Sequence, residues 1–448
     1  MELVWDRGTL LIRDASCPAS LPGVLWDPRV AAWRAPAHVH ADLLAASATG
    51  TPVVDRARQP AGELPGFAVP ELRPYQEAAL AAWEIAGRRG VIALPTGAGK
   101  TRTAIVAIAR TRVCALCLVP TRVLLEQWVA ALKAAGLRDV GRFGDGERHL
   151  APVTIATYAS ALRHADALGN RFDLLVVDEA HHFGGGAGDE CLEMSIARFR
   201  LGLSATPVDD ERRRERCESL IGSVVFRSAI EDLAGRFLAP FQLLTLSLPL
   251  DAYERRAYDR EVAAYRPAVR RFFEAAPGAD WNDFVANASR TEDGRRAMAA
   301  WRRARSMLAF TRAKQRAVSE LLARNVRSRM LLFAADTATA YAIARTHLVP
   351  ALTCDIGRSE RADLLARFAQ GELRVLVSAR VLNEGVDVPE ADVAILVGGT
   401  QGKREFVQRV GQVLRPAQGK QAVVFELVSR GTHEVQEADR RRRGLAAD

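Results

Sequence analysis

Two short clusters in the first half of the chain have the residue types and spacing needed to hold and hydrolyse a nucleoside triphosphate. In the first, residues 91–101, an apolar run ends at a glycine-bearing loop and a helical pattern follows. Glycines let backbone N–H groups surround phosphate oxygens, and the start of a helix adds partial positive charge. Lys100 would reach the β- and γ-phosphates, and the Thr101 hydroxyl would bind Mg²⁺. A chance Gly/Lys turn is the alternative, but the strand before and the helix after favour a phosphate loop made by Pro95, Thr96, Gly97, Ala98, Gly99, Lys100 and Thr101.

The second cluster is an acidic pair at the end of the apolar run 172–177. Asp178 would hold Mg²⁺, and Glu179 would orient and deprotonate the attacking water. His181 follows without a matching Cys/His cluster, which favours a hydrogen-bonding relay over a zinc site. Ser204 and Thr206 end a later strand, and hydrogen bonds from them towards the acidic pair would couple the phosphate site to movement.

The elements that must position these groups alternate between strands and helices. Apolar strand patterns cover residues 91–94, 113–119, 153–157, 172–177 and 201–206, which predicts an α/β fold with a parallel sheet. Just upstream, Gln76 follows Arg73, and its amide offers both a donor and an acceptor to adenine. A strand end that meets a helix start is a natural place to hold a phosphate backbone, so we expect a grip on nucleic acid from Thr121, Arg122 and Thr157.

Composition limits the class of protein. The chain has 448 residues, 49% of them hydrophobic, which suggests two or three domains with proper cores. A formal net charge of +9 favours an anionic polymer as partner, although a solvated surface would carry the same charge. No apolar run is long enough to span a bilayer, and we expect no secretion signal. Six scattered cysteines do not form a disulfide framework, so a reducing cytoplasm is the expected location.

The order of the motifs resembles that of the superfamily 2 helicases, and the details are similar to the XPB family of DNA helicases. The similarity covers nearly the whole chain, and it is carried by LRPYQ at 72–76, DEAHH at 178–182, SAT at 204–206, NEGVDVP at 383–389 and ELVSRGT at 426–432. The resemblance implies two RecA-like parallel-sheet lobes, a small N-terminal α+β domain and a helical thumb. The expected boundaries are a damage-recognition-like domain at 1–67, lobe 1 at 68–244, the thumb at 245–325 and lobe 2 at 326–448.

Two aromatic-rich regions have alternative interpretations. Trp5, Trp26 and Trp33 of the N-terminal domain could stack on bases or fill a small core. Between 245 and 325 the strand–helix rhythm stops, and basic and aromatic residues interleave in helical patterns. These helices form either a surface hairpin with packed aromatics and solvated arginines, or the DNA-gripping thumb that the resemblance implies, with Arg270, Arg271 and Phe272 on the DNA.

The resemblance also supplies expectations for the second lobe. Gly385 would permit close backbone approach, and Asp387 would bind a ribose hydroxyl or position its loop between ATP and DNA. A sixth motif on a helix from 404 to 415 would include Gln408, Arg409, Gly411 and the candidate arginine finger Arg415.

The resemblance implies an ATP- and Mg²⁺-dependent DNA motor of 3′→5′ polarity. It would act on single-stranded, forked or bubble DNA in excision repair with a nuclease partner. Three alternatives stay open: an RNA helicase, an ATP-gated DNA clamp with weak unwinding, and a restriction-system motor.

Two positions depart from the family pattern. Gln412 stands where the family has an arginine, and a glutamine cannot supply positive charge to a phosphate. Asp209, Asp210 and Glu211 stand where the family has an Arg-Glu-Asp loop used in strand separation, which leaves open whether this chain unwinds duplex or only distorts it.

Restoring the family residue tests the first departure. We expect Gln412→Arg to raise the DNA-stimulated kcat, because a missing arginine finger costs on the order of 10³-fold in rate and Arg415 compensates only in part. Steady-state ATP hydrolysis at saturating DNA measures the effect. An unchanged kcat would show that Gln412 does not limit turnover.

Overall fold

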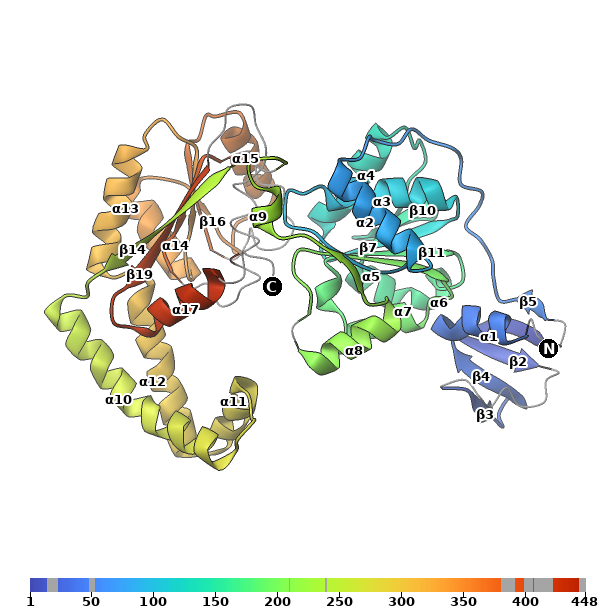
Figure 1. Cartoon of the computed structure of the whole chain (residues 1–448), viewed down its shortest axis with the longest axis horizontal. Helices are drawn as coiled ribbons and strands as arrows, with labels where there is room; N and C mark the ends of the chain where they lie inside the picture. Colours follow the sequence, from blue (N-terminus) through green and yellow to red (C-terminus); the bar gives the residue numbers. More distant parts are fainter. Residues whose placement is uncertain are drawn as a thin grey trace. The chain divides into compact units, whose positions relative to one another are not determined.

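The computed structural model describes residues 1–13, 23–47, 53–208, 210–237, 240–379, 391–398, 406 and 422–442. These residues form two compact units, one within residues 1–229 and one that begins at Ile230 (Figure 1). None of the helices in the described part is both long and apolar enough to cross a membrane. The expected α/β class with parallel-sheet lobes is confirmed, and each unit has its own sheet and core.

The first unit begins with a small α+β domain. Its strands, in the order β3-β4-β2-β1-β5, are β1 (Glu2–Asp6), β2 (Thr9–Arg13), β3 (Leu25–Asp27), β4 (Ala32–Pro36) and β5 (Val54–Arg56), and its helix is α1 (His40–Ser47). The tryptophans divide between packing and exposure. Trp5 donates from its indole nitrogen to the carbonyl of Asp166 (3.1 Å), whereas Trp26 is 51% exposed and meets Trp33 edge to face. Ile196 of lobe 1 enters the core of this domain, so the two are packed together.

Lobe 1 is built on an eight-stranded sheet of order β13-β6-β12-β11-β7-β10-β8-β9, parallel except at β9. Its central strands are apolar on both faces, as burial between two helix layers requires. The strands are β6 (Arg89–Ala93), β7 (Ala115–Val119), β8 (Gly141–Gly144), β9 (Glu147–His149), β10 (Val153–Thr157), β11 (Leu174–Asp178), β12 (Phe199–Ser204) and β13 (Val224–Arg227). The helices are α2 (Pro74–Ile85), α3 (Lys100–Thr111), α4 (Arg122–Ala134), α5 (Tyr158–Arg163), α6 (Ala165–Leu168), α7 (Glu190–Glu193) and α8 (Glu211–Leu220).

The second unit contains a six-stranded, fully parallel sheet of order β14-β19-β18-β15-β17-β16. Its strands are β14 (Phe241–Leu248), β15 (Met330–Phe333), β16 (Ala351–Leu352), β17 (Val375–Ser378), β18 (Val393–Leu396) and β19 (Ala422–Ser429). Its helices are α9 (Ile230–Leu233), α13 (Arg312–Arg324), α14 (Thr337–His347), α15 (Arg358–Ala369) and α17 (His433–Arg442). We call this sheet and its helices lobe 2.

The thumb consists of α10 (Ala252–Ala275), α11 (Trp281–Arg290) and α12 (Glu292–Ala309), with α10 and α12 side by side and α11 at their far end (Figure 1). The packing of two elements, β14 and α13, differs from the domain boundaries expected after residues 244 and 325. β14 pairs along its whole length with β19, so residues 241–244 lie in the sheet of lobe 2. α13 packs Ala317, Val318 and Leu321 against that sheet, because its apolar face matches the sheet core. The helical stretch therefore divides between the thumb and lobe 2.

A buried arginine holds the amino end of β12, the strand whose carboxyl end bears Ser204. The side chain of Arg200 is 0% exposed, and its guanidinium donates to the carbonyls of Ala197, Leu192, Leu220 and Ser195 at 2.6–3.1 Å. These carbonyls come from the ends of α7 and α8 and the segment between α7 and β12. One side chain thus binds four buried carbonyls, of which that of Leu192 also accepts from the N–H of Ser195 (3.4 Å), so removal of the guanidinium would leave the other three without this donor.

We expect Arg200→Met to destabilise this unit by at least about 3 kcal/mol, since each orphaned buried acceptor costs on the order of 1 kcal/mol. Urea denaturation followed by tryptophan fluorescence measures the free energy of unfolding. The control is Arg198→Met, two residues away, because the exposed Arg198 lies only against the Phe199 ring and its loss should cost less than about 0.5 kcal/mol. Equal losses for the two variants would contradict the assigned role of Arg200.

Candidate functional site

The phosphate loop connects β6 to α3. Gly97 and Gly99 have φ angles of 83° and 80°, a left-handed conformation that side-chain-bearing residues rarely adopt. A Cβ added at Gly99 would also lie 2.4 Å from Nε2 of Gln76, so both space and conformation require glycine there. Lys100 and Thr101 open α3, and Lys100 Nζ donates to the carbonyl of Leu94 (3.3 Å). The loop therefore has the backbone geometry that the sequence predicts.

Gln76 anchors this loop from α2. Its side-chain oxygen accepts from the backbone N–H of Arg73 (2.9 Å), and its Nε2 donates to the carbonyl of Ala98 (2.7 Å). Tyr75 donates from its hydroxyl to the same carbonyl (2.8 Å). Gln76 is 2% exposed, so both functional ends of its amide are engaged with backbone. Contact with adenine, the role expected from sequence, would require these bonds to be exchanged.

The acidic pair lies at the carboxyl end of β11, beside the phosphate loop. Glu179 Oε1 is 4.0 Å from Lys100 Nζ, and both carboxylates are buried. Burial and the neighbouring Glu179 charge raise the pKa of Asp178. Burial acts in the same direction on Glu179, but Lys100 and His181 outweigh it and hold the pKa of Glu179 below its usual range. The pKa values of the two adjacent carboxylates are thus shifted in opposite directions.

Three of the predicted coupling residues lie together behind the acidic pair. His181 Nδ1 is 3.3 Å from Glu179 Oε2 and 3.2 Å from Ser204 Oγ. The hydroxyl of Ser204 donates to the carbonyl of Thr206 (2.6 Å). The structure therefore connects β11 to the end of β12 through one imidazole ring and one hydroxyl.

The predicted nucleic-acid grip lies on the same edge of the sheet. Strands β7 and β10 are parallel neighbours, with Thr157 in register with Val119, so the residues that follow them meet at one edge. Thr121 caps α4 by accepting from the N–H of Leu124 (3.3 Å), and Thr157 caps α5 by accepting from that of Ser160 (3.3 Å). Arg122 forms an ion pair with Asp145, and its side chain is 44% exposed.

Two residues that the sequence reasoning missed, Trp128 and Tyr158, contact the acidic pair from α4 and α5. Trp128 of α4 donates from its indole nitrogen to Asp178 Oδ2 (2.9 Å), and this contact is buried. The hydroxyl of Tyr158 donates to the carbonyls of Asp178 and Glu179. Trp128 lies six residues into the helix that Arg122 opens, so α4 connects the grip to the acidic pair. Its position on the apolar face of that helix was the available signal, but that pattern is equally typical of a core residue.

The loop and the acidic pair fit a magnesium-bound nucleoside triphosphate. The hydroxyl of Thr96 is buried without a hydrogen-bond partner among the described residues, as a loop that receives phosphate oxygens would leave it. Lys100, the start of α3 and the Thr101 hydroxyl offer donors and a metal ligand, and the buried carboxylate of Asp178 offers a second oxygen ligand. Bound Mg²⁺ would neutralise phosphate charge at this edge.

The other predicted residues lie in the thumb, at the start of α8 or outside the described residues. Arg270 pairs with Glu274 within α10 (2.7 Å), and Arg271 is exposed. The ring of Phe272 is half-buried among Phe273 and Phe284, which is the packing alternative left open above. Asp210 caps α8 by accepting from Arg213 N–H (2.9 Å). Outside the described residues are Asp209, Gly385, Asp387, Gln408, Arg409, Gly411, Gln412 and Arg415.

Comparisons with known families agree with this geometry. The model for the damage recognition domain of the xeroderma pigmentosum group B helicase matches residues 3–57. The model for the res subunit of type III restriction enzymes matches residues 70–209, and that for the conserved C-terminal helicase domain matches 313–417. Together the three models match each of the two lobes and the N-terminal domain.

Individual relatives show to which helicase family the chain is similar. The DNA 3′-5′ translocase XPB2 of Sulfurisphaera tokodaii is 35% identical over 377 residues, which cover 83% of this chain and 84% of that protein. The DNA 3′-5′ helicase XPB of Mycobacterium tuberculosis is 28% identical over 84% of this chain and 64% of its own length. Among solved structures, the Pyrococcus furiosus Hef helicase domain covers 83% of this chain at a TM-score of 0.53 and 20% identity, a likeness of fold alone.

We expect Trp128→Phe to raise the Mg²⁺ concentration for half-maximal ATP hydrolysis by about tenfold, because hydrogen bonds to a metal-binding carboxylate orient it. A magnesium titration of the steady-state rate measures this. Trp83→Phe is the matched control, since the indole of Trp83 is also buried and donates one hydrogen bond, to the carbonyl of Arg200, away from the acidic pair. The same magnesium dependence in both variants would contradict a role for Trp128 at Asp178.

Proposed function

The chain belongs to the XPB family of DNA helicases and translocases, and from this premise we propose that it uses ATP hydrolysis to move on DNA and to open or distort the duplex. One observation carries the proposal: phosphate loop, acidic pair and nucleic-acid grip share the carboxyl edge of one parallel sheet, and Trp128 ties the grip to Asp178. Ligands of open α/β sheets bind at this edge.

In the proposed reaction, each residue of lobe 1 has one task. Lys100 binds the terminal phosphates, and Thr101 and Asp178 hold Mg²⁺. Glu179, ionised beside Lys100, orients a water molecule and accepts its proton as the water attacks the γ-phosphate. When the γ-phosphate is cleaved, His181 and Ser204 shift the end of β12 through the hydrogen bond between them.

The proposed motor also needs the second lobe. Gly385, Asp387, Gln408, Arg409 and Arg415 would supply the opposite side of the nucleotide site, with Arg415 as the arginine finger and Gln412 in the position that the family fills with arginine. Thr121, Arg122 and Thr157 would hold one DNA strand, and Arg270 and Arg271 of the thumb would contact the phosphate backbone. We propose 3′→5′ movement, as the names of the relatives state for those proteins.

The wider role is proposed from the N-terminal domain. Its match to a damage recognition model supports residues 1–67 as a module that directs the motor to altered DNA, in excision repair together with a nuclease. A single-stranded, forked or bubble substrate fits that role.

Nucleic-acid-stimulated ATP hydrolysis tests the proposed function. We expect single-stranded and forked DNA to stimulate kcat more than RNA of the same sequence, because the proposal assigns DNA as the substrate. Displacement of a protein block from single-stranded DNA then measures movement. Stimulation by RNA alone would favour an RNA helicase, and ATP turnover without displacement would favour a DNA clamp.

Within that experiment, Arg122→Gln tests the grip. The variant should weaken DNA binding by roughly tenfold and reduce the salt slope by about one, because one phosphate contact is lost. The control is Arg138→Gln. Arg138 is exposed and precedes the amino end of β8, whereas Arg122 follows the carboxyl end of β7. Equal DNA affinity and salt slope in the two variants would remove Arg122 from the grip.

A further inference from the structure

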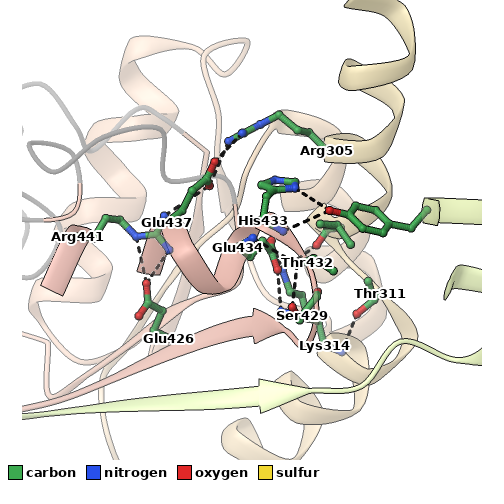
Figure 2. Close-up of polar contacts among 12 residues, drawn as sticks. Arg305, Thr311, Lys314, Glu426, Ser429, Thr432, His433, Glu434, Glu437 and Arg441 are labelled. Carbon is green, nitrogen blue, oxygen red and sulfur yellow. Dashed lines mark hydrogen bonds and ion pairs between the residues drawn. The ribbon is translucent and has the colours of Figure 1, made fainter. Parts of the chain in front are cut away.

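The junction between the thumb and lobe 2 is built around a buried ion pair, Lys314–Glu434. Both elements belong to the second unit, and the junction converges on the turn 429–432 between β19 and α17 (Figure 2). We call its members the clasp: Arg255, Tyr258, Arg305, Lys314, the turn 429–432, His433, Glu434 and Glu437.

At its centre, Lys314 of α13 is 0% exposed. Its ammonium donates to Glu434 Oε1 (2.8 Å) and to the carbonyl of Leu308 near the end of α12 (2.7 Å). The other oxygen of Glu434 accepts from the N–H of Ser429 (2.8 Å). A buried ammonium is stable only while it is paired, so thumb helix, turn and α17 must stay together around this charge.

The first thumb helix holds the same turn from another direction. The hydroxyl of Tyr258 accepts from the N–H of His433 (3.2 Å) and lies 3.1 Å from its Nδ1. The guanidinium of Arg255 donates to the carbonyls of Gly431 (3.0 Å) and Arg430. Gly431 has a φ of 70°, a left-handed conformation that glycine adopts without strain.

An ion-pair chain continues from the thumb into the sheet. Arg305 of α12 donates to Glu437 of α17 (2.7 Å), and Arg441 lies 3.8 Å from the same carboxylate. Arg441 in turn donates to Glu426 (2.7 Å), a buried residue of β19, and Figure 2 shows the successive contacts from Arg305 through Glu437 and Arg441 to Glu426. β19 pairs with β14 and β18, so this chain ends inside the sheet of lobe 2.

The contacts are concentrated at the clasp. A cavity of about 220 Å³ lies beside it, lined from the thumb by Trp301, Arg302 and Ser306 and from lobe 2 by Ala335 and Asp336. The cavity leaves the thumb base and the start of α14 without close packing there. Within the described part of the chain, the thumb is held against lobe 2 by the clasp, by the N–H of Arg312 in α13, which donates to Glu254 of α10 (2.8 Å), and by the chain connections at 249–251 and 310–311.

We propose that the clasp makes the thumb a rigid extension of lobe 2, so that nucleotide-driven displacement of lobe 2 is delivered to DNA on the thumb. The delivery to DNA rests on the proposed function, whereas the rigidity does not. The clasp residues are positioning residues: they act through the orientation of the thumb.

The test variant removes clasp contacts that surround the Lys314–Glu434 ion pair. Lys314→Ala would orphan Glu434 in the interior and could simply prevent folding, so the variant combines Arg255→Gln, Tyr258→Phe and Arg305→Gln. The charge-matched control combines Arg296→Gln and Arg303→Gln, whose ion pairs with Glu292 and Glu261 stay within the thumb.

Two readouts separate the parts of the proposal. Amide hydrogen exchange without DNA should become about tenfold faster in α10 and α12 of the clasp variant, with the strands of lobe 2 unchanged. Blocks displaced per ATP hydrolysed should fall roughly fivefold, while DNA-stimulated kcat stays within about twofold of wild type. The control variant should match wild type in both.

Unchanged exchange in the clasp variant would overturn the rigid connection. Faster exchange with normal displacement per ATP would overturn delivery through the clasp. If the wild-type protein itself shows no DNA-stimulated hydrolysis, the proposed function fails, and the exchange measurement still decides whether the clasp holds the thumb.

Discussion

The carboxyl ends of parallel strands meet at one edge of a sheet, and lobe 1 depends on this constraint. It brings the phosphate loop after β6, the acidic pair after β11 and the Ser204 hydroxyl after β12 into one row. The next strands in the row are β7, which leads into Thr121 and Arg122, and β10, which ends at Thr157. The candidate nucleotide site and the candidate nucleic-acid grip thus become neighbours without any long connection, and one helix, α4, begins at Arg122 and reaches Asp178 through Trp128.

Buried charge is the second recurring feature, and each instance joins more than one element of the chain. Arg200 gathers four carbonyls around the amino end of β12, and Lys314 gathers α12, α17 and the turn before α17. Charges in the interior are tolerated only with close partners, so each one makes its surroundings cooperative. In lobe 1 this stabilises the strand that carries Ser204, and in lobe 2 it ties the thumb to the sheet.

The two units therefore divide the work of a motor in different ways. The first holds the hydrolytic residues and its candidate grip on a single rigid sheet edge. The second extends its sheet through an ion-pair chain into two long helices. A motor needs lobes that move as bodies, because a soft joint within a lobe would absorb the displacement that hydrolysis produces.

The sequence alone determined the features that depend on local chemistry. Glycines at 97 and 99, the acidic pair after an apolar run, and the strand–helix rhythm are each encoded within about ten residues, so the α/β class and the candidate phosphate loop followed from them, and the family followed from the resemblance of short motifs along the chain. Tertiary structure decided the features that join distant positions: Trp128 contacts Asp178 across 50 residues, and Lys314 contacts Glu434 across 120. It also assigned β14 to lobe 2 and packed Phe272 among other aromatic rings. A tryptophan or lysine on a helix looks the same in sequence whether it faces core, partner or solvent, because only the packed chain determines which groups must share a buried charge.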